Sequence, residues 1–251
     1  MSLIEVERDA GVAVVTLNDP ERRNALSLPM IGEIIELFDA IEDDESVGAV
    51  VVTGAPPAFC AGADLSHLGS SQEQGLRDMY EGFMRVSRCS LPTLAAVNGA
   101  AVGAGMNLAL TCDVRLASRR ARFDTRFVEL GLHPGGGHTW MMQQIVGPQV
   151  SSATVLFGEI LDAGEAERVG LVFRAVDEDS LMEAALDMAR RSASGPRELV
   201  RRMKDTLRRA GQAPTHEEGM ELEVEPQVWS VKQPEFAERI AKIAERISSK
   251  R

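Results

Sequence analysis

The chain has 251 residues, of which 44% are apolar and 26% are charged, a composition typical of a soluble globular protein with one large α/β core. Its 38 acidic residues outnumber its 27 Lys and Arg residues, and the net charge of −11 argues against nucleic acid as the main partner. No apolar run approaches the roughly 20 residues that span a bilayer, and the three cysteines, Cys60, Cys89 and Cys112, show no metal-type spacing. We therefore expect a cytoplasmic protein with no membrane partner and no metal.

The first part of the chain alternates between strand and helix patterns. Two apolar segments, 3–8 and 12–17, meet at Asp9-Ala10-Gly11 and predict a β-hairpin. Ser27 is a typical helix cap, and the apolar residues after it recur every three or four positions, which predicts a helix to about residue 41. The continuous apolar run 47–53 is typical of a buried strand.

A second round of the same kind follows, and the chain then becomes mostly helical. The patterns predict a helix over about 73–89, a strand over 92–97, a small-residue turn over 99–105 that opens a helix, and strands over 112–117 and 171–176. From about residue 178 onward we expect separate helices, broken at Pro196, Pro226 and Pro234. The fold class is therefore α/β, with a core over residues 1–190 and a helical region over 191–251 that caps the core or serves oligomerisation.

Several segments rich in small residues are candidates for a binding loop. Residues 98–105 lack the third glycine of a dinucleotide-binding motif, because Leu108 stands in its place. No glycine loop ends in the Lys-Ser/Thr pair of a phosphate-binding loop, and the chain has no Gly-x-Ser-x-Gly motif. His133 and His138 have no carboxylate or cysteine partner nearby in the sequence, so they do not predict a metal site.

Two loops remain, and both follow a predicted strand. One ends in Ala61-Gly62-Ala63-Asp64, and the other, Val102-Gly103-Ala104-Gly105, opens a helix. Glycines let the backbone approach a ligand closely, and the N-terminus of a helix carries partial positive charge. Two backbone N–H groups aimed at one carbonyl oxygen would form an oxyanion hole.

These two loops, together with other segments of the chain, resemble the crotonase (enoyl-CoA hydratase/isomerase) superfamily. The matching segments lie in family order over most of residues 3–180; they are 20–26, 58–65, 92–99, 102–105, 112–115, 131–135 and 161–172. The resemblance implies a crotonase-like spiral of repeated ββα units with a C-terminal helical region, assembled as a homotrimer or hexamer. It also implies an acyl-CoA thioester as the ligand. No cofactor is expected, because coenzyme A enters as part of the substrate.

The resemblance also implies which residues form the site. The thioester oxygen would accept hydrogen bonds from the amides of Ala63 and Ala104, and Tyr80 would fall on the helix that lines the acyl pocket. Six residues would meet the coenzyme A portion: Arg23, Ala25, Ala61, Ala63, Asp64 and Leu65. The phosphates of coenzyme A need local cations despite the acidic chain, and Arg22 and Arg23 are candidates.

The match departs from the family at its two acid/base positions. Asn107 and Phe127 stand where hydratases of this family carry glutamates, and each such group contributes roughly 10²–10⁴ in rate. Glu129 and His133 are the candidate replacements. If the segment around Phe127 is a helix, Glu129 is turned by about 200° from that position, away from the cavity.

Three functions therefore stay open. The first is an enoyl-CoA hydratase or isomerase, which the resemblance implies but in which Asn107 and Phe127 make efficient hydration doubtful. The second is a catalytically silent acyl-CoA binding protein, which the aromatic Phe127 favours. The third is another reaction through the same enolate, such as decarboxylation or thioester cleavage.

Overall fold

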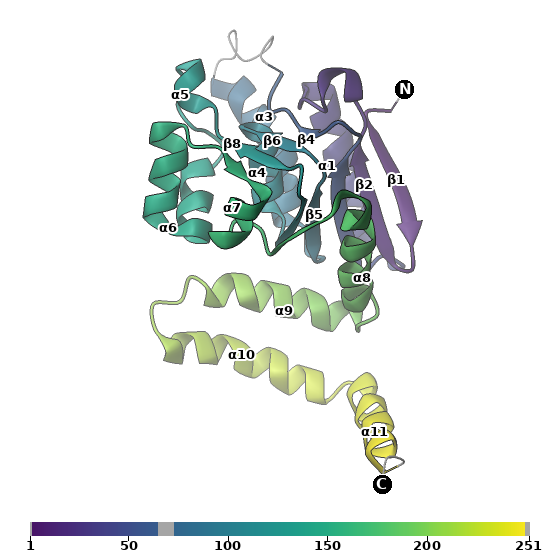
Figure 1. The fold of residues 1–251 in the computed structure, drawn as a ribbon. Coiled ribbons are helices and arrows are strands. Elements are labelled where there is room, and N and C mark those ends of the chain that lie inside the picture. Colours follow the sequence, from purple (N-terminus) through teal and green to yellow (C-terminus); the bar gives the residue numbers. More distant parts are fainter. Residues whose placement is uncertain (1, 65–72, 249–251) are drawn as a thin grey trace. The chain divides into compact units, whose positions relative to one another are not determined.

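The computed structural model describes residues 2–64 and 73–248 (Figure 1). The chain divides into two compact units, Met1–Ala193 and Ser194–Arg251. The first unit holds the strands and the helices packed on them, and the second is helical.

The larger sheet of the first unit has, in the described residues, the strand order β1-β2-β3-β5-β7-β10. Its strands are β1 (Ile4–Asp9), β2 (Val12–Leu17), β3 (Ala49–Gly54), β5 (Thr93–Val97), β7 (Val114–Ser118) and β10 (Arg174–Val176). The first two form the predicted hairpin, in which Ala10 and Gly11 both have positive φ, as a two-residue turn requires. The other pairs are parallel, and the central strands β3 and β5 are wholly buried, as their continuous apolar runs predict.

A smaller sheet with the order β4-β6-β8-β9 was not predicted from the sequence. Its strands are β4 (Ala58–Cys60), β6 (Ala100–Val102), β8 (Arg122–Asp124) and β9 (Leu161–Asp162). The expected small-residue turn over 99–105 is wrong in this respect, because β6 runs through it. Strands of two or three residues are too short to show an alternating pattern, so only their pairing identifies them.

Helices cover both faces of the larger sheet. The helices of the first unit are α1 (Leu28–Asp43), α3 (Glu73–Arg88), α4 (Ala104–Thr111), α5 (Phe127–Leu130), α6 (His138–Phe157), α7 (Ala163–Arg168) and α8 (Leu181–Ala193), with short 3-10 turns at Pro20–Arg22 and Glu178–Ser180. Ser27 caps α1 as predicted, since its side chain accepts a hydrogen bond from the N–H of Met30. Helix α8 packs on one face through Leu181, Ala185 and Ala189, and α1, α3 and α4 belong to the core on the other face.

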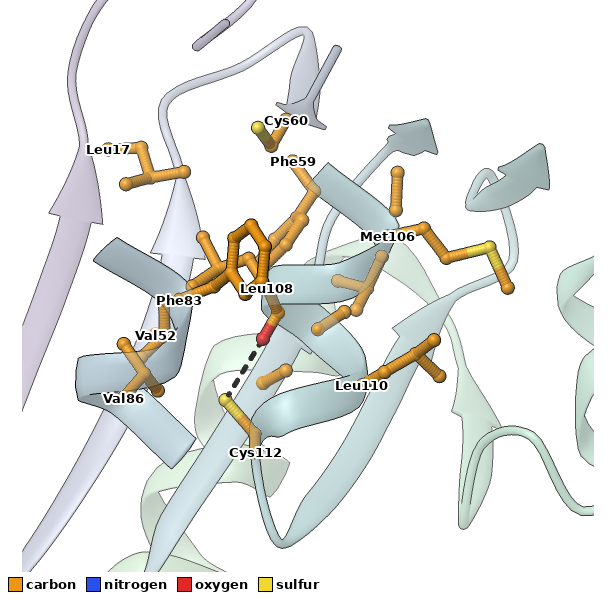
Figure 2. Close-up of a cluster of buried hydrophobic side chains, with 14 of the residues drawn as sticks. Leu17, Val52, Phe59, Cys60, Phe83, Val86, Met106, Leu108, Leu110 and Cys112 are labelled. Atoms are coloured by element: carbon orange, nitrogen blue, oxygen red, sulfur yellow. Dashed lines mark hydrogen bonds between the residues drawn. The ribbon is translucent and has the colours of Figure 1, made fainter. Parts of the chain in front are cut away.

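Helix α4 lies inside this core, with all but its first residue buried. Figure 2 shows Met106, Leu108 and Leu110 among aromatic and aliphatic side chains of the strands and of α3, including Phe59 and Phe83. The Sγ of Cys112 lies 3.7 Å from the carbonyl oxygen of Leu108 at the end of the helix. Because the interior is close-packed, the start of α4 is held in a fixed position.

The second unit consists of α9 (Arg197–Ala210), α10 (His216–Val231) and α11 (Pro234–Ser248). Within it, the Arg202 guanidinium lies 4.3 Å from the ring centroid of Trp229 and joins α9 to α10. The prediction that Pro226 ends a helix is wrong, because α10 runs through it. A proline removes one N–H donor from a helix, and α10 continues on both sides of Pro226. In the described residues no helix is long and apolar enough to cross a membrane.

Candidate active site

A cavity of about 730 Å³ lies in the first unit, between α3, the start of α4, α5 and the loops around them. Nine of the residues expected at the site line it: Ala25, Ala61, Ala63, Asp64, Ala104, Asn107, Phe127, Glu129 and His133. Tyr80 and Arg22 line it as well, whereas Arg23 does not. Leu65 lies outside the described residues. The structure therefore brings most of the expected residues to one cavity.

The first of the two loops is held by a short parallel pairing with residues 23–26. The N–H of Ala61 donates to the carbonyl of Arg23 at 3.0 Å, the N–H of Leu26 to that of Gly62 at 2.8 Å, and the N–H of Asp64 to that of Leu26 at 2.9 Å. In this parallel pairing the carbonyl of Gly62 and the N–H of Asp64 form hydrogen bonds, whereas the N–H of Ala63 points away from the paired segment. In the described part of the chain nothing accepts a hydrogen bond from that N–H.

The second N–H belongs to Ala104, the first residue of α4. An amide in the first turn of a helix has no acceptor within the helix, and none of the described residues supplies one. The preceding residue, Gly103, has φ 49° and ψ −114°, a conformation that glycine adopts readily. The turn thus places an unpaired N–H at the positive end of a buried helix.

Two glycines hold these N–H groups close to each other. A Cβ on Gly105 would lie 2.2 Å from the carbonyl oxygen of Cys60, so only glycine lets α4 pack directly on β4. A Cβ on Gly62, which has φ 109°, would lie 3.0 Å from the carbonyl oxygen of Val102 and 4.0 Å from the amide nitrogen of Ala104. The loop that carries Ala63 therefore runs beside the turn that carries Ala104.

One charged pair lies at the edge of the cavity formed by residues 22–25 and 61–64. Arg22 Nη1 lies 3.6 Å from Asp64 Oδ2, and the arginine side chain is 65% exposed. Arg23, by contrast, contributes its backbone carbonyl to the pairing with Ala61, and its side chain is exposed. Of the two arginines expected to meet coenzyme A, Arg22 lines the cavity and Arg23 does not; Arg126 also lines it, beside α5.

Asn24 is a structural residue of this loop that the sequence analysis did not identify. It is fully buried with φ 58°, and its Nδ2 donates to the carbonyls of Ala55 and Ala58 at 2.8 and 2.9 Å. Its Oδ1 accepts from the N–H of Asp19. An asparagine after a turn sequence, tolerant of positive φ, is the signal that would have indicated it.

Asn107 lies one turn after Ala104 on α4, and both polar atoms of its side chain have partners. Its Nδ2 donates to the carbonyl of Gly135 at 3.0 Å, and its Oδ1 lies 2.7 Å from Nδ1 of His138. His138 is 1% exposed, and burial lowers the pKa of its imidazole to about 4. Its Nε2 has no partner in the described structure. The sequence did not predict this contact, because residues 107 and 138 are far apart in the chain and His138 was tested there as a metal ligand.

Phe127 and Glu129 are both among the residues that line the cavity, although the Glu129 side chain was expected to be turned away from it. That expectation assumed a cavity along one face of a long helix. Helix α5 has only four residues, bounded by Arg126 and Gly131 in left-handed conformations, and the cavity meets it along its length. Phe127 is buried with its ring edge-on to His138 at 4.9 Å, whereas the Glu129 carboxylate is largely exposed, 3.7 Å from Arg126.

His133 lies on the loop after α5, and its ring is exposed. Its Nδ1 is 2.7 Å from the carbonyl oxygen of Pro134. Because a carbonyl only accepts, this contact places the ring proton on Nδ1 and the lone pair on Nε2. Among the described residues no group of three His, Cys, Asp or Glu side chains is arranged to hold a metal ion.

Fold and cavity together define a protein of the crotonase class, and comparison with known proteins agrees. The model of the family "Enoyl-CoA hydratase/isomerase" matches residues 7–249. The chain is 51% identical over 242 residues to a probable enoyl-CoA hydratase, EchA14, of Mycobacterium tuberculosis, covering 93% of this chain and 94% of the relative. It is 35% identical over 212 residues to a short-chain-enoyl-CoA hydratase of Clostridium acetobutylicum, covering 82% of this chain and 81% of the relative.

A solved structure gives the same assignment. A probable enoyl-CoA hydratase/isomerase from Mycobacterium abscessus superimposes with a TM-score of 0.89 at 34% identity, covering 98% of this chain and 97% of the other. The chain therefore belongs to the enoyl-CoA hydratase/isomerase family, and its expected activity is that of an enzyme that processes acyl-CoA.

Proposed function

We propose that this protein binds an acyl-CoA thioester in the 730 Å³ cavity and stabilises its enolate through the N–H groups of Ala63 and Ala104. The observation that carries this proposal is the pair of backbone amides, both without an acceptor in the described residues, on two loops that Gly62 and Gly105 hold together. Each preorganised donor is worth roughly 3–4 kcal/mol when negative charge develops on the oxygen. Arg22 is the cation proposed to meet a phosphate of coenzyme A, because it lines the cavity together with Ala25 and Asp64, two of the residues expected to meet coenzyme A.

The acid/base group in this proposal is His133. Its Nε2 lone pair takes a proton from Cα of the acyl group, and the electron pair of the broken C–H bond moves onto the thioester oxygen between the two amides. Returning the proton to carbon regenerates the thioester. Glu129 is the second candidate base, since this residue also lines the cavity.

Exchange of the Cα hydrogens with solvent measures this step directly. Butyryl-CoA is incubated with the protein in D₂O, and deuterium uptake is followed by mass spectrometry. We expect a gain of one and then two deuterons. The His133→Gln variant removes the base and should exchange about 10²-fold more slowly, and Glu129→Gln is its matched control. If butyryl-CoA binds and exchanges no hydrogen, the enolate proposal is wrong.

The same assay separates the alternative reactions. Crotonyl-CoA gains one water if the protein is a hydratase, malonyl-CoA loses CO₂ if it is a decarboxylase, and free coenzyme A appears if it is a thioesterase. We propose that crotonyl-CoA hydration is slow, because Asn107 and Phe127 supply no carboxylate at the two family positions. Rapid hydration would contradict this.

A silent acyl-CoA binding protein is the second candidate function. The buried ring of Phe127 favours it, since an aromatic side chain makes that wall of the cavity apolar. Binding of acyl-CoA with no mass change and no deuterium exchange is its signature.

We also propose that the protein assembles as a homotrimer or hexamer. In support, Leu156, Phe157, Ile160 and Phe173 of the first unit are 49–83% exposed, an apolar surface that association would cover. Light scattering after size exclusion tests this, and a monomer at micromolar concentration would contradict it.

A further inference from the structure

Two of the described residues that line the cavity are arginines, and the proposed function uses only one of them. Arg22 lies beside Asp64, at the edge where coenzyme A is expected. Arg126 stands immediately before α5, next to Phe127. The position of Arg126 relative to the two amides determines which part of a ligand it can meet.

The smaller sheet places the backbone of Arg126 close to that of Ala104. Strands β6 and β8 are parallel neighbours in which Val102 pairs with Asp124, and the N–H of Gly103 donates to the carbonyl of Asp124 at 2.9 Å. Neighbouring strands lie about 4.8 Å apart, so the two segments leave the sheet side by side and reach Ala104 and Arg126 two residues later. Arg126 therefore starts beside the turn that carries one of the amides proposed to bind the thioester oxygen.

The guanidinium of Arg126 is held by a buried carboxylate. Its Nε and Nη2 donate to Oδ2 of Asp124 at 2.9 and 2.6 Å, and the Asp124 side chain is only 9% exposed. A buried carboxylate without a partner is costly, so this pair fixes the arginine in the wall. Glu129 Oε2 lies farther away, 3.7 Å from Nε, on a side chain that is 74% exposed and therefore screened by solvent.

This pairing leaves most of the guanidinium unused. A guanidinium has five N–H groups, and two of those of Arg126 donate to Asp124. None of the described residues accepts a hydrogen bond from the other three, and the side chain is 44% exposed, so water satisfies them in the open cavity. A hydrocarbon chain that displaced this water would leave them without acceptors, which is unfavourable. A carboxylate would accept from two of them at once.

We propose that Arg126 is a specificity-determining residue that binds a carboxylate on the acyl chain, so that the preferred ligand is the coenzyme A thioester of a dicarboxylic acid. Asp124 holds the guanidinium for this contact. Because Asp124 and Glu129 balance its charge, the preference comes from directed hydrogen bonds and is of moderate size. This inference rests on the proposed function of the cavity, and it adds a selection among acyl groups that the amides of Ala63 and Ala104 do not make.

The test compares ligands that differ only at the last carbon of the acyl chain. Glutaryl-CoA carries a carboxylate where pentanoyl-CoA carries a methyl group, and succinyl-CoA and butyryl-CoA form the same pair with one carbon fewer. Titration calorimetry measures all four dissociation constants. We expect the wild-type protein to bind the carboxylated member of at least one pair about tenfold more tightly, the lower end of the value of a hydrogen bond to a charged group. Equal or weaker binding of the carboxylated member in both pairs would overturn the inference.

Variants of Arg126 identify the group that makes the preference. Arg126→Gln should reduce it to about one. Since this variant leaves the Asp124 carboxylate buried without its partner, a second variant, Arg126→Gln with Asp124→Asn, removes both charges and should give the same result. Arg122→Gln is the matched control, because Arg122 lies on β8 but does not line the cavity, and it should keep the tenfold preference.

The same titrations separate the possible sources of the anionic group. If Arg126→Gln weakens both members of a pair equally, the arginine meets a phosphate of coenzyme A, and the inference is wrong. If none of the four thioesters binds the wild-type protein, the proposed function itself fails. If all four bind without a preference for the carboxylate, only this inference fails.

Discussion

Lowering the pH from 7 to 5 should destabilise this protein through His138. Burial lowers the pKa of its imidazole in the folded protein to about 4, from 6.5 for an unfolded chain, and no charged neighbour contributes to that change. As the pH falls through 6.5, the His138 imidazole becomes protonated in the unfolded chain, whereas in the folded protein it stays neutral until about pH 4. The free energy of unfolding therefore decreases as the pH falls between these values, and above 6.5 this contribution is nearly constant.

The difference between the two pKa values corresponds to about 3 kcal/mol when the unfolded imidazole is fully charged. Between pH 7 and pH 5, where protonation of the unfolded chain is nearly complete and the folded ring is still neutral, we expect a loss of about 2 kcal/mol. Urea unfolding followed by circular dichroism measures it. Carboxylates also titrate in this range, so the quantity of interest is the difference between the wild-type protein and His138→Asn.

The variant removes the titrating ring and should lose about 2 kcal/mol less than the wild-type protein between the two pH values. His133→Gln is the matched control, because His133 lies on the loop that precedes α6 with its ring exposed, and this variant should keep the loss that depends on His138. Equal pH dependence in the wild-type protein and His138→Asn would refute the argument that a neutral buried imidazole holds Asn107.

Further variants test the rest of the site. Gly105→Ala places a methyl group against the Cys60 carbonyl, so we expect a loss of about 1–3 kcal/mol in unfolding free energy and loss of deuterium exchange, measured by urea unfolding and mass spectrometry. Arg22→Ala should weaken acyl-CoA binding a few-fold, with a smaller effect at 0.5 M salt, because an exposed cation is screened. Phe127→Glu with Asn107→Glu should raise crotonyl-CoA hydration by at least 10²-fold, read as loss of enoyl absorbance, and no gain would mean that the cavity differs beyond these two positions.

The larger sheet and its helices were predictable because most of these elements are long enough to show a hydrophobic pattern in the sequence. The alternation around Asp9-Ala10-Gly11 and the cap at Ser27 each fixed an element to within a few residues. The smaller sheet was not, since β6 and β9 offer three and two residues and depend on partners distant in the sequence. Pro226 shows the opposite error, in which a strong local signal is overridden by the helix on both sides of it.

The candidate site was also predictable only in part. Glycines that bring two loops together are visible in sequence, because a residue without a side chain at a strand end implies close backbone approach. What the sequence hid is the partner of each side chain. From the sequence, Asn107 is a residue that cannot transfer a proton. Only the contact with His138 shows that the oxygen of its amide faces that histidine.

The contacts of His138 bear on how the two positions without glutamate, 107 and 127, are interpreted. His138 contacts both Asn107 and Phe127, so a substitution at one of the two family positions also changes the surroundings of the residue that contacts the other. A glutamate at 107 would present a carboxylate to the Gly135 carbonyl, which already needs the donor that Asn107 Nδ2 supplies. Two acceptors face to face in a buried wall are unfavourable. The His138 Nδ1–H is the donor that a carboxylate at position 107 would still have. Adding His138→Phe to the double variant should therefore slow crotonyl-CoA hydration, and a triple variant as fast as the double variant would show that His138 does not couple the two positions.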